Sequence, residues 1–427
     1  MVTGTLIGRA ENHCPGLPFG FVFAHDKLPK ICSLTLPNRV VLIRKFMLLR
    51  IRFVIGALLV VCYAIPFTAA DGPVPSGPPP VPPIESVSDI GTVVQNSNVA
   101  GRDGNFSALL LGQSVWTFGD TSMTVPGVNG RNWDDNSLAW TAKLDASHGI
   151  KLEHDLLDST GAPGEYLPLT PWELQYNNTH DSRNCTAQPC GSEYALWGGP
   201  VVADPLRNRA LFFYDEIYRV SGQAGWTNIG AGIAVGTPDR KFVRPQNGSD
   251  TPNMWGPNEV AYAGGSLVVG TTMYSYGCVA GFLVMHCRVA RVTLADALDK
   301  SRWTYYAGSG MWSANPSAAV VVFDGGAAGN SVFYSPYLGM YVAIYSGVFS
   351  NNVYYRVSWT PWGPWSDQTF LFTGRQGWND NADYAALAHP EFAQESGRIQ
   401  YVTYAHTYGF LRQNLPIVRV VFGNPAQ

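Results

Sequence analysis

Three related phrases recur about sixty residues apart between residues 196 and 316. Residues 196–200 read Leu-Trp-Gly-Gly-Pro, residues 254–259 read Met-Trp-Gly-Pro-Asn-Glu, and residues 311–316 read Met-Trp-Ser-Ala-Asn-Pro. Each phrase opens a segment of short apolar and aromatic runs separated by Gly, Asn, Asp and Pro, which is typical of strands and turns. A repeat of this length with several strands indicates a blade-type β repeat. We therefore expect an all-β fold, a five-bladed β-propeller whose first strands surround a central funnel.

Five units of about sixty residues account for the chain beyond its N-terminal part. They cover residues 92–152, 194–244, 254–306, 311–373 and 383–422. The only helix that we expect is a short one over residues 294–300. A protein of two β-sandwiches is the structural alternative, which the repeat spacing makes the weaker one.

The N-terminal part differs in composition from the rest. Arg50 and Arg52 precede an apolar run over residues 53–65 and a small-residue site ending at Ala70, the pattern of a secretory signal peptide. A start at Met47 would give that peptide an ordinary length, so residues 1–70 are expected to be an N-terminal extension plus the signal segment. An uncleaved membrane anchor is the alternative, since residues 53–70 are barely long enough to span a bilayer. Residues 71–85 form a Pro-rich linker, and the single folded domain covers residues 86–427.

The charge distribution bears on partners. Of the 28 basic and 31 acidic residues, 8 and 2 lie within residues 1–70, so the remainder carries nine more acidic than basic groups. An acidic body does not favour nucleic-acid binding. After signal cleavage no segment is apolar enough for a stable membrane span, and we expect a secreted monomer.

The cysteines agree with export. Cys185 with Cys190 and Cys278 with Cys287 are the favoured disulfide pairs because each pair is local in sequence. Zinc binding is the weaker alternative, since the spacing lacks a Cys-x-x-Cys motif. The sequence also contains glycosylation motifs of the Asn-x-Ser/Thr type, at Asn105, Asn177, Asn184 and Asn247.

Several phrases together resemble a known family. They are Gly-Arg-Asp-Gly-Asn-Phe-Ser at 101–107, Trp-Thr-Phe-Gly-Asp-Thr at 116–121, the phrase at 254–259, Tyr-Ser-Pro-Tyr-Leu-Gly-Met-Tyr at 334–341 and Pro-Trp-Gly-Pro-Trp at 361–365. The chain is similar over about residues 92–423 to a secreted five-bladed propeller family, formerly of unknown function, in which some members are endo-D-arabinanases. The resemblance implies a glycoside hydrolase acting on a D-arabinan-like polysaccharide of the cell wall. The Trp-Met-Asn-Asp-Pro-Asn-Gly signature of fructan-cutting relatives is absent from the sequence.

Glycoside hydrolysis needs two carboxyl groups on either side of the scissile bond. Asp103, between an arginine and a glycine before the first expected inner strand, is our candidate for the base or nucleophile. Glu259, on the expected first strand of the third blade, is the candidate general acid, for which a raised pKa is required. Asp120 is expected to support the site by shifting the pKa of a neighbour. Each of the three could instead be an ordinary turn or strand-end carboxylate.

Aromatic and amide side chains beside the repeated phrases are the expected sugar contacts, because the faces of sugar rings pack on indole rings. The expected substrate-binding residues are Trp197, Trp255, Asn258, Trp312, Asn315, Trp378 and His389. Packing between blades would explain any one of the tryptophans equally well. His389 could line the axial channel and help hold a structural cation, although a buried core histidine is the more ordinary explanation. We expect no catalytic metal ligands and no required cofactor.

The sequence thus favours a secreted glycoside hydrolase, with D-arabinan as the substrate that the resemblance implies, over two alternatives. One alternative is a glycan-binding propeller without catalysis, in which the carboxylates need not converge. The other is a cell-wall adhesion protein, which the Pro-rich linker suggests and which would lack a deep polar pocket.

Overall fold

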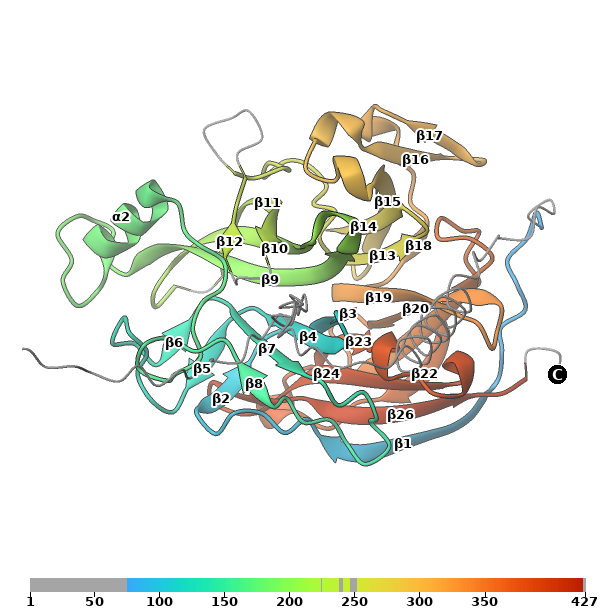
Figure 1. Cartoon of the computed structure of the whole chain (residues 1–427), viewed down its shortest axis with the longest axis horizontal. Helices are drawn as coiled ribbons and strands as arrows, with labels where there is room; N and C mark the ends of the chain where they lie inside the picture. Colours follow the sequence, from blue (N-terminus) through green and yellow to red (C-terminus); the bar gives the residue numbers. More distant parts are fainter. Residues whose placement is uncertain (1–74, 224, 238–240, 246–251, 425–427) are drawn as a thin grey trace, which may run out of the picture. The chain divides into compact units, whose positions relative to one another are not determined.

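The computed structural model describes residues 75–223, 225–237, 241–245 and 252–424. The expected N-terminal extension and signal segment, residues 1–70, lie outside these ranges, as do residues 71–74 of the expected linker and the motif at Asn247. The described chain is all-β, as predicted, and its strands form antiparallel sheets (Figure 1). In this part of the chain no helix is long and apolar enough to cross a membrane.

In the described chain, five sheets contain four or more strands each (Figure 1). In the first four of these sheets, the strand that comes first in sequence lies at one edge of the sheet. The first sheet contains β3 (Phe106–Leu110), β4 (Gln113–Phe118), β7 (Ser137–Thr141) and β8 (His154–Asp155). The second contains β9 (Ser192–Asp204), β10 (Arg209–Val220), β11 (Thr227–Gly236) and β12 (Phe242–Val243). The third contains β13 (Gly265–Val269), β14 (Thr272–Ala280), β15 (Met285–Thr293), β16 (Thr304–Gly308), β17 (Met311–Ser313) and β18 (Phe323–Asp324).

The fourth and fifth sheets follow, with one smaller sheet beside them. The fourth sheet contains β19 (Ala327–Ser335), β20 (Met340–Ser346), β21 (Asn352–Ser358) and β22 (Thr369–Thr373). The fifth contains β23 (Tyr384–Ala388), β24 (Ile399–Gly409), β25 (Arg412–Asn414), β26 (Pro416–Phe422) and the early strand β1 (Ile84–Thr92). A smaller sheet contains β2 (Val99–Arg102), β5 (Thr121–Met123) and β6 (Trp133–Asp134).

The sheets are short meanders because turn residues interrupt apolar runs at close intervals. Between β3 and β4, Leu111 and Gly112 both have positive φ, 52° and 81°, as a two-residue hairpin loop of the type I′ class requires. Pairing of β1 with β26 joins the first and last parts of the described chain, and the sequence repeats did not predict this pairing. Pro82, assigned to the linker from sequence, is buried and accepts a hydrogen bond from Tyr355.

Five hydrophobic clusters hold the sheets together, and each cluster combines residues from two sheets. One joins the first and second sheets, and others join the second to the third, the third to the fourth and the fourth to the fifth. The remaining cluster joins the fifth sheet back to the first through residues such as Trp116, Tyr401 and Ile417. Contacts between first strands follow the same order, from β3 to β9, β13, β19 and β23.

Two expectations about local structure are wrong. The phrase at 254–259 precedes β13 as a loop, and the phrase at 311–316 begins with β17 at the outer side of the third sheet, so neither forms a first strand. The structure also contains a ten-residue helix, α2 (Pro171–His180), that we did not predict, whereas the expected helix at 294–300 consists of short 3₁₀ turns. Helix α2 begins with a capping box in which Thr170 and Glu173 bond to each other's backbone amides.

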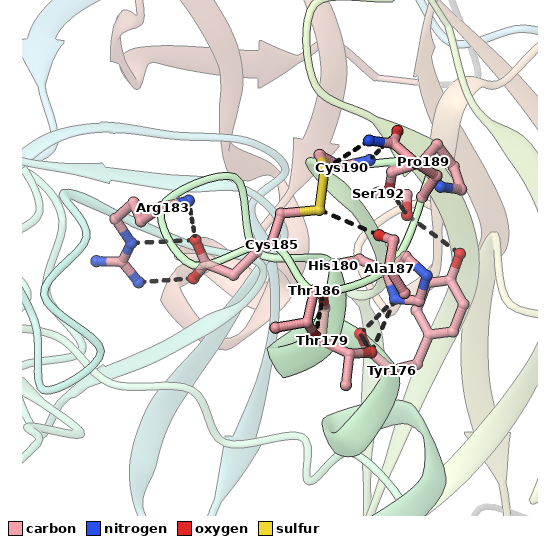
Figure 2. Close-up of a disulfide and its surroundings, with 12 residues drawn as sticks. Tyr176, Thr179, His180, Arg183, Cys185, Thr186, Ala187, Pro189, Cys190 and Ser192 are labelled. Atoms are coloured by element: carbon pink, nitrogen blue, oxygen red, sulfur yellow. Dashed lines mark hydrogen bonds and ion pairs between the residues drawn. A yellow bond between two sulfur atoms is a disulfide. The ribbon is translucent and has the colours of Figure 1, made fainter.

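Both predicted disulfides are confirmed. Cys185 pairs with Cys190, and Figure 2 shows this bridge beside the end of α2 that carries Thr179 and His180. Cys278 pairs with Cys287 across β14 and β15, where the two residues lie directly opposite each other. Each bridge closes a short local loop, as the sequence spacing suggested.

Candidate active site

Asp103 lies between β2 and β3, and Asp120 lies between β4 and β5. The two residues are neighbours in the structure. The Asp103 backbone N–H donates to the Asp120 carbonyl at 2.8 Å, and the Gly119 N–H donates to the Asp103 carbonyl at 2.8 Å. These two hydrogen bonds hold the two backbone segments together. The Asp120 carboxylate is close enough for its charge to act on the Asp103 carboxyl. The structure therefore brings together two of the three predicted catalytic carboxylates.

The Asp103 carboxyl is set up to hold its proton unusually strongly. Burial, followed by the charge of Asp120, raises the pKa of Asp103 to about 6. The Tyr384 hydroxyl, at the start of β23, and the Gly104 amide donate to this carboxyl and oppose the rise. Gln413 in turn donates to the Tyr384 hydroxyl at 2.6 Å, which fixes the position of the tyrosine.

Asp120 has a different environment because Arg219 of β10 faces it. Arg219 Nη1 lies 2.9 Å from both carboxylate oxygens of Asp120. Burial raises the pKa of Asp120, and the charge and hydrogen bonds of Arg219 oppose that rise. The indole N–H of Trp197 faces Asp120 and also favours its ionised form, although the geometry is not that of a normal hydrogen bond.

Arg219 is shared among several acidic groups. Its guanidinium also bonds to Asp135 and, at 2.7 Å, to Glu193, which pairs with Arg131 at 2.8 Å. Burial and the nearby charge of Glu165 raise the pKa of Asp135 well above its ordinary value. Carboxylates thus outnumber guanidinium groups around Asp120, and this excess of negative charge disfavours the ionised forms of the buried carboxyl groups. Among the described residues, no group of three or more His, Cys, Asp or Glu could hold a metal ion.

Aromatic rings lie on the exposed side of this cluster. Trp197 is half-buried, and its indole lies against Gly119, where an added Cβ would be 3.5 Å from the ring. The ring centroids of Trp197 and Trp226 are 5.0 Å apart in a T-shaped pair. Trp226 is 61% exposed. An exposed indole beside two carboxyl groups is a suitable surface for a sugar ring.

Asp215 is a further carboxyl group near Trp197. The two residues are directly opposite each other on β10 and β9, so their side chains share one face of the sheet. Burial alone raises the pKa of Asp215 to about 6, and its side chain has no hydrogen-bond partner among the residues that the structure describes. The adjacent Glu216 points away and pairs with Arg244, as alternation along a strand requires.

Glu259 lies apart from Asp103 in a separate set of contacts. Its carboxylate is bound by Lys300 Nζ at 2.6 and 2.7 Å and by the Gly256 amide at 2.7 Å. Burial raises the pKa of Glu259, but the Gly256 amide and Lys300 outweigh burial and the pKa is lowered. The prediction of a raised pKa for Glu259 is therefore wrong, because Lys300 stabilises the carboxylate anion, whereas a general acid must hold its proton. The prediction that Glu259 lies on a first strand is also wrong, because Glu259 lies in the loop before β13.

Two of the expected sugar-binding side chains are inaccessible. Trp255 is 1% exposed and packs at right angles to Trp303, with ring centroids 5.3 Å apart. His389 is fully buried, stacked 4.0 Å from Trp116, and bonded to Ser107 and Thr403 at 2.6 Å each. Burial lowers the pKa of His389 to about 3, so it is neutral. Both are core residues, which corrects the expectation.

The other predicted contacts remain on the surface or near it, and their roles remain predictions. Asn258 is exposed and Trp378 is 42% exposed. Asn315 is exposed but caps a 3₁₀ turn by accepting from the Ser317 amide at 3.0 Å. Trp312 is half-buried with Arg291 above its ring at 4.1 Å.

Sequence reasoning missed Arg219, Tyr384 and Asp135. Arg219 is the one of the three with a usable signal, since a charged residue near the end of an apolar strand is uncommon. Tyr384 of the fifth sheet bonds to Asp103, and Asp135 bonds to Arg219 at a separation of 84 positions, so neither contact follows from a local sequence pattern.

The fold is similar to that of a solved structure, a candidate hydrolase of Bacteroides ovatus ATCC 8483. That protein is 16% identical with a TM-score of 0.50, covering 78% of this chain and 87% of its own. At this identity the likeness concerns the fold. Residues 222–409 match the family model described as a domain of unknown function, DUF4185.

Two other solved structures are similar at lower scores. A family 117 glycoside hydrolase of Zobellia galactanivorans is 10% identical, with a TM-score of 0.45 over 79% of this chain and 90% of its own. A native arabinanase of Bacillus subtilis is 9% identical, with a TM-score of 0.42 over 77% of this chain and 96% of its own. The chain matches none of the curated proteins in sequence.

Proposed function

We propose that the protein is a glycoside hydrolase whose catalytic pair is Asp103 and Asp120. The observation that carries this proposal is the adjacency of two carboxyl groups in different electrostatic environments, beside accessible indole rings. Two carboxyl groups whose environments differ in this way are the requirement for acid–base cleavage of a glycosidic bond.

In the proposed mechanism Asp103 is the general acid, which replaces both the base role first expected for it and the acid role expected for Glu259. Its pKa of about 6 lets it hold a proton in mildly acidic solution and give that proton to the leaving glycosidic oxygen. Asp120, facing the Arg219 guanidinium, is the anionic partner that activates water or attacks the anomeric carbon. Arg219 fixes the orientation of Asp120 and favours its negative charge. No cofactor is required by these steps.

The fold supports a funnel-shaped site. We propose that the five larger sheets are the blades of a five-bladed propeller, since the hydrophobic clusters between them connect in a closed order and their first strands contact one another in sequence from β3 to β23. Asp103 comes just before β3 and Tyr384 begins β23, so both lie where first strands start. Loops at that end of a propeller are where such a fold accommodates a chain-like ligand.

The substrate proposal is a D-arabinan-like polysaccharide cut within the chain, and it is supported by the sequence resemblance described above. Trp197 and Trp226 would pack against the sugar rings flanking the scissile bond. The two disulfides are compatible with an extracellular protein, and we propose secretion through the segment ending at Ala70 and action as a monomer.

The test is incubation of the purified protein with mycobacterial arabinogalactan and a panel of plant arabinans, with released oligosaccharides identified by chromatography and mass spectrometry. Oligomers from the mycobacterial polymer alone would support endo-D-arabinanase activity. Release only from plant arabinans would keep the hydrolase and change the sugar. Binding to these polymers without release from any would refute the hydrolase proposal in favour of a lectin.

A further inference from the structure

A cavity whose lining does not include Asp103 lies around Glu259. It has a volume of about 820 Å³ and extends between α2, the second sheet and the loop before β13. Its lining includes Trp172, Tyr194, Glu216, Asn253, Glu259 and Lys300. None of these residues belongs to the cluster of Asp103, Asp120 and Arg219, so the mechanism proposed above leaves this cavity without a role.

One wall of the cavity is aromatic. Trp172, in the first turn of α2, is 58% exposed, and its ring lies 5.0 Å from Tyr194 in a T-shaped arrangement. Tyr176 holds the indole from another side at 5.8 Å. The capping box of Thr170 and Glu173 fixes the first turn of α2, and with it the backbone of Trp172. The indole is therefore held in place and remains accessible.

The polar groups of the cavity are also held in place. Glu216 is 3% exposed and receives hydrogen bonds from Arg244 at 2.8 Å and from Asn253 at 2.7 Å. At the rim, the side chains of Glu259 and Lys300 are 40% and 35% exposed, and the two side chains form an ion pair. Arg244 pairs with Glu173 and Glu216, and Lys300 pairs with Glu259. Each carboxylate therefore has a cationic partner, and the cavity presents hydrogen-bonding groups with little net charge.

These features suit a neutral ligand that has both an apolar face and several hydroxyl groups. An immobilised indole packs against the C–H face of a sugar ring, and a carboxylate beside an ammonium group can accept from and donate to hydroxyl groups. A strongly anionic or cationic ligand would lack the opposite charge that its desolvation requires. A cavity of this size accommodates a ligand of a few sugar units.

We propose that this cavity is a second saccharide-binding site, separate from the hydrolytic centre, with Trp172 as its stacking surface. The choice of a saccharide as ligand rests on the proposed function. Such a site would hold a neighbouring part of the same polysaccharide or a released product.

The test is isothermal titration of the full-length Asp103→Asn variant, which cannot hydrolyse the probe, with linear arabino-oligosaccharides and, separately, xylo-oligosaccharides. Trp172→Ala in that background is expected to weaken one binding event by about tenfold, the range that an aromatic contact contributes. Leu174→Ala is the matched control, since Leu174 is a 51% exposed apolar residue of the same helix outside the cavity lining. Trp172→Phe is expected to restore part of the affinity.

Each outcome bears on the inference. Identical binding by the Trp172→Ala and Leu174→Ala variants would overturn it, as would the absence of binding by any saccharide. Loss of binding that tracks Trp197→Ala alone would assign all binding to the hydrolytic centre and would also overturn it. Failure of the wild-type protein to hydrolyse any glycan, with Trp172-dependent binding intact, would remove the proposed catalytic function and leave the second site standing.

Discussion

Replacement of Asp103 by Asn should stabilise the protein at neutral pH while it abolishes hydrolysis. Burial and Asp120 raise the pKa of Asp103 from 3.8 to about 6 in the folded protein. Each tenfold change in proton affinity is worth about 1.4 kcal/mol, so ionisation of Asp103 costs the folded state up to about 3 kcal/mol. Asn cannot ionise and keeps an oxygen that can accept from Tyr384.

The pH dependence gives this prediction its sign. Between about pH 3.8 and 6 the folded protein binds more protons at Asp103 than the unfolded chain does, so wild-type stability falls as pH rises through that window. The advantage of Asp103→Asn should therefore be near zero at pH 4, grow up to pH 6 and stay constant above it. For about 350 folded residues the unfolding entropy is about 0.7 kcal/mol per degree, so the largest increase in Tm is about 4 °C.

The assay is thermal unfolding of both proteins at fixed scan rate from pH 4 to pH 8. Asp181→Asn is the contrasting control, because Arg183 and Arg131 lower the pKa of the Asp181 carboxyl, so loss of this carboxylate should lower Tm at neutral pH. A lower Tm for Asp103→Asn at pH 7, or a difference that does not change with pH, would refute the electrostatic description of the site.

Three further predictions concern the same site and the core. Hydrolysis should decline as pH rises through about 6, because Asp103 must be protonated to act as the acid; a pH profile of kcat/KM that is flat to pH 8 would contradict this role. Arg219→Leu should destabilise the protein by about 3–5 kcal/mol, since Asp120, Asp135 and Glu193 lose their shared counter-charge, and denaturant unfolding would measure the loss. His389 should not titrate between pH 5 and 8, because its pKa is about 3, and NMR of labelled histidine would disprove the buried neutral state by showing a transition there.

The regularities of the sequence predicted the fold class better than they placed its parts. Alternating apolar runs and turn residues determine strands locally, which is why the all-β class was predictable. Both disulfides were predictable because each cysteine pair is local in sequence. The phrase at 254–259 misled the assignment because its Trp255 is a core residue next to Trp303, in a loop before β13. The pairing of β1 with β26 depends on residues more than three hundred positions apart, beyond any local pattern.

The candidate site shows the same division. Asp103 and Asp120 could be found because Asp103 directly precedes a recognisable strand phrase and Asp120 directly follows one. The contribution of Tyr384 and Arg219 depends on the fold, since residues of the fifth and second sheets reach carboxylates beside the first. Glu259 shows the converse, because the sequence gives no sign that Lys300, forty-one positions away, would neutralise it.

The most direct measurement of the central claim is product release from mycobacterial arabinogalactan by the wild-type, Asp103→Asn and Asp120→Asn proteins, each confirmed as folded. The account predicts that the wild type releases oligosaccharides and that each substitution lowers the rate by at least about 100-fold. Release at the wild-type rate by either variant would contradict the assignment of this pair as the catalytic centre.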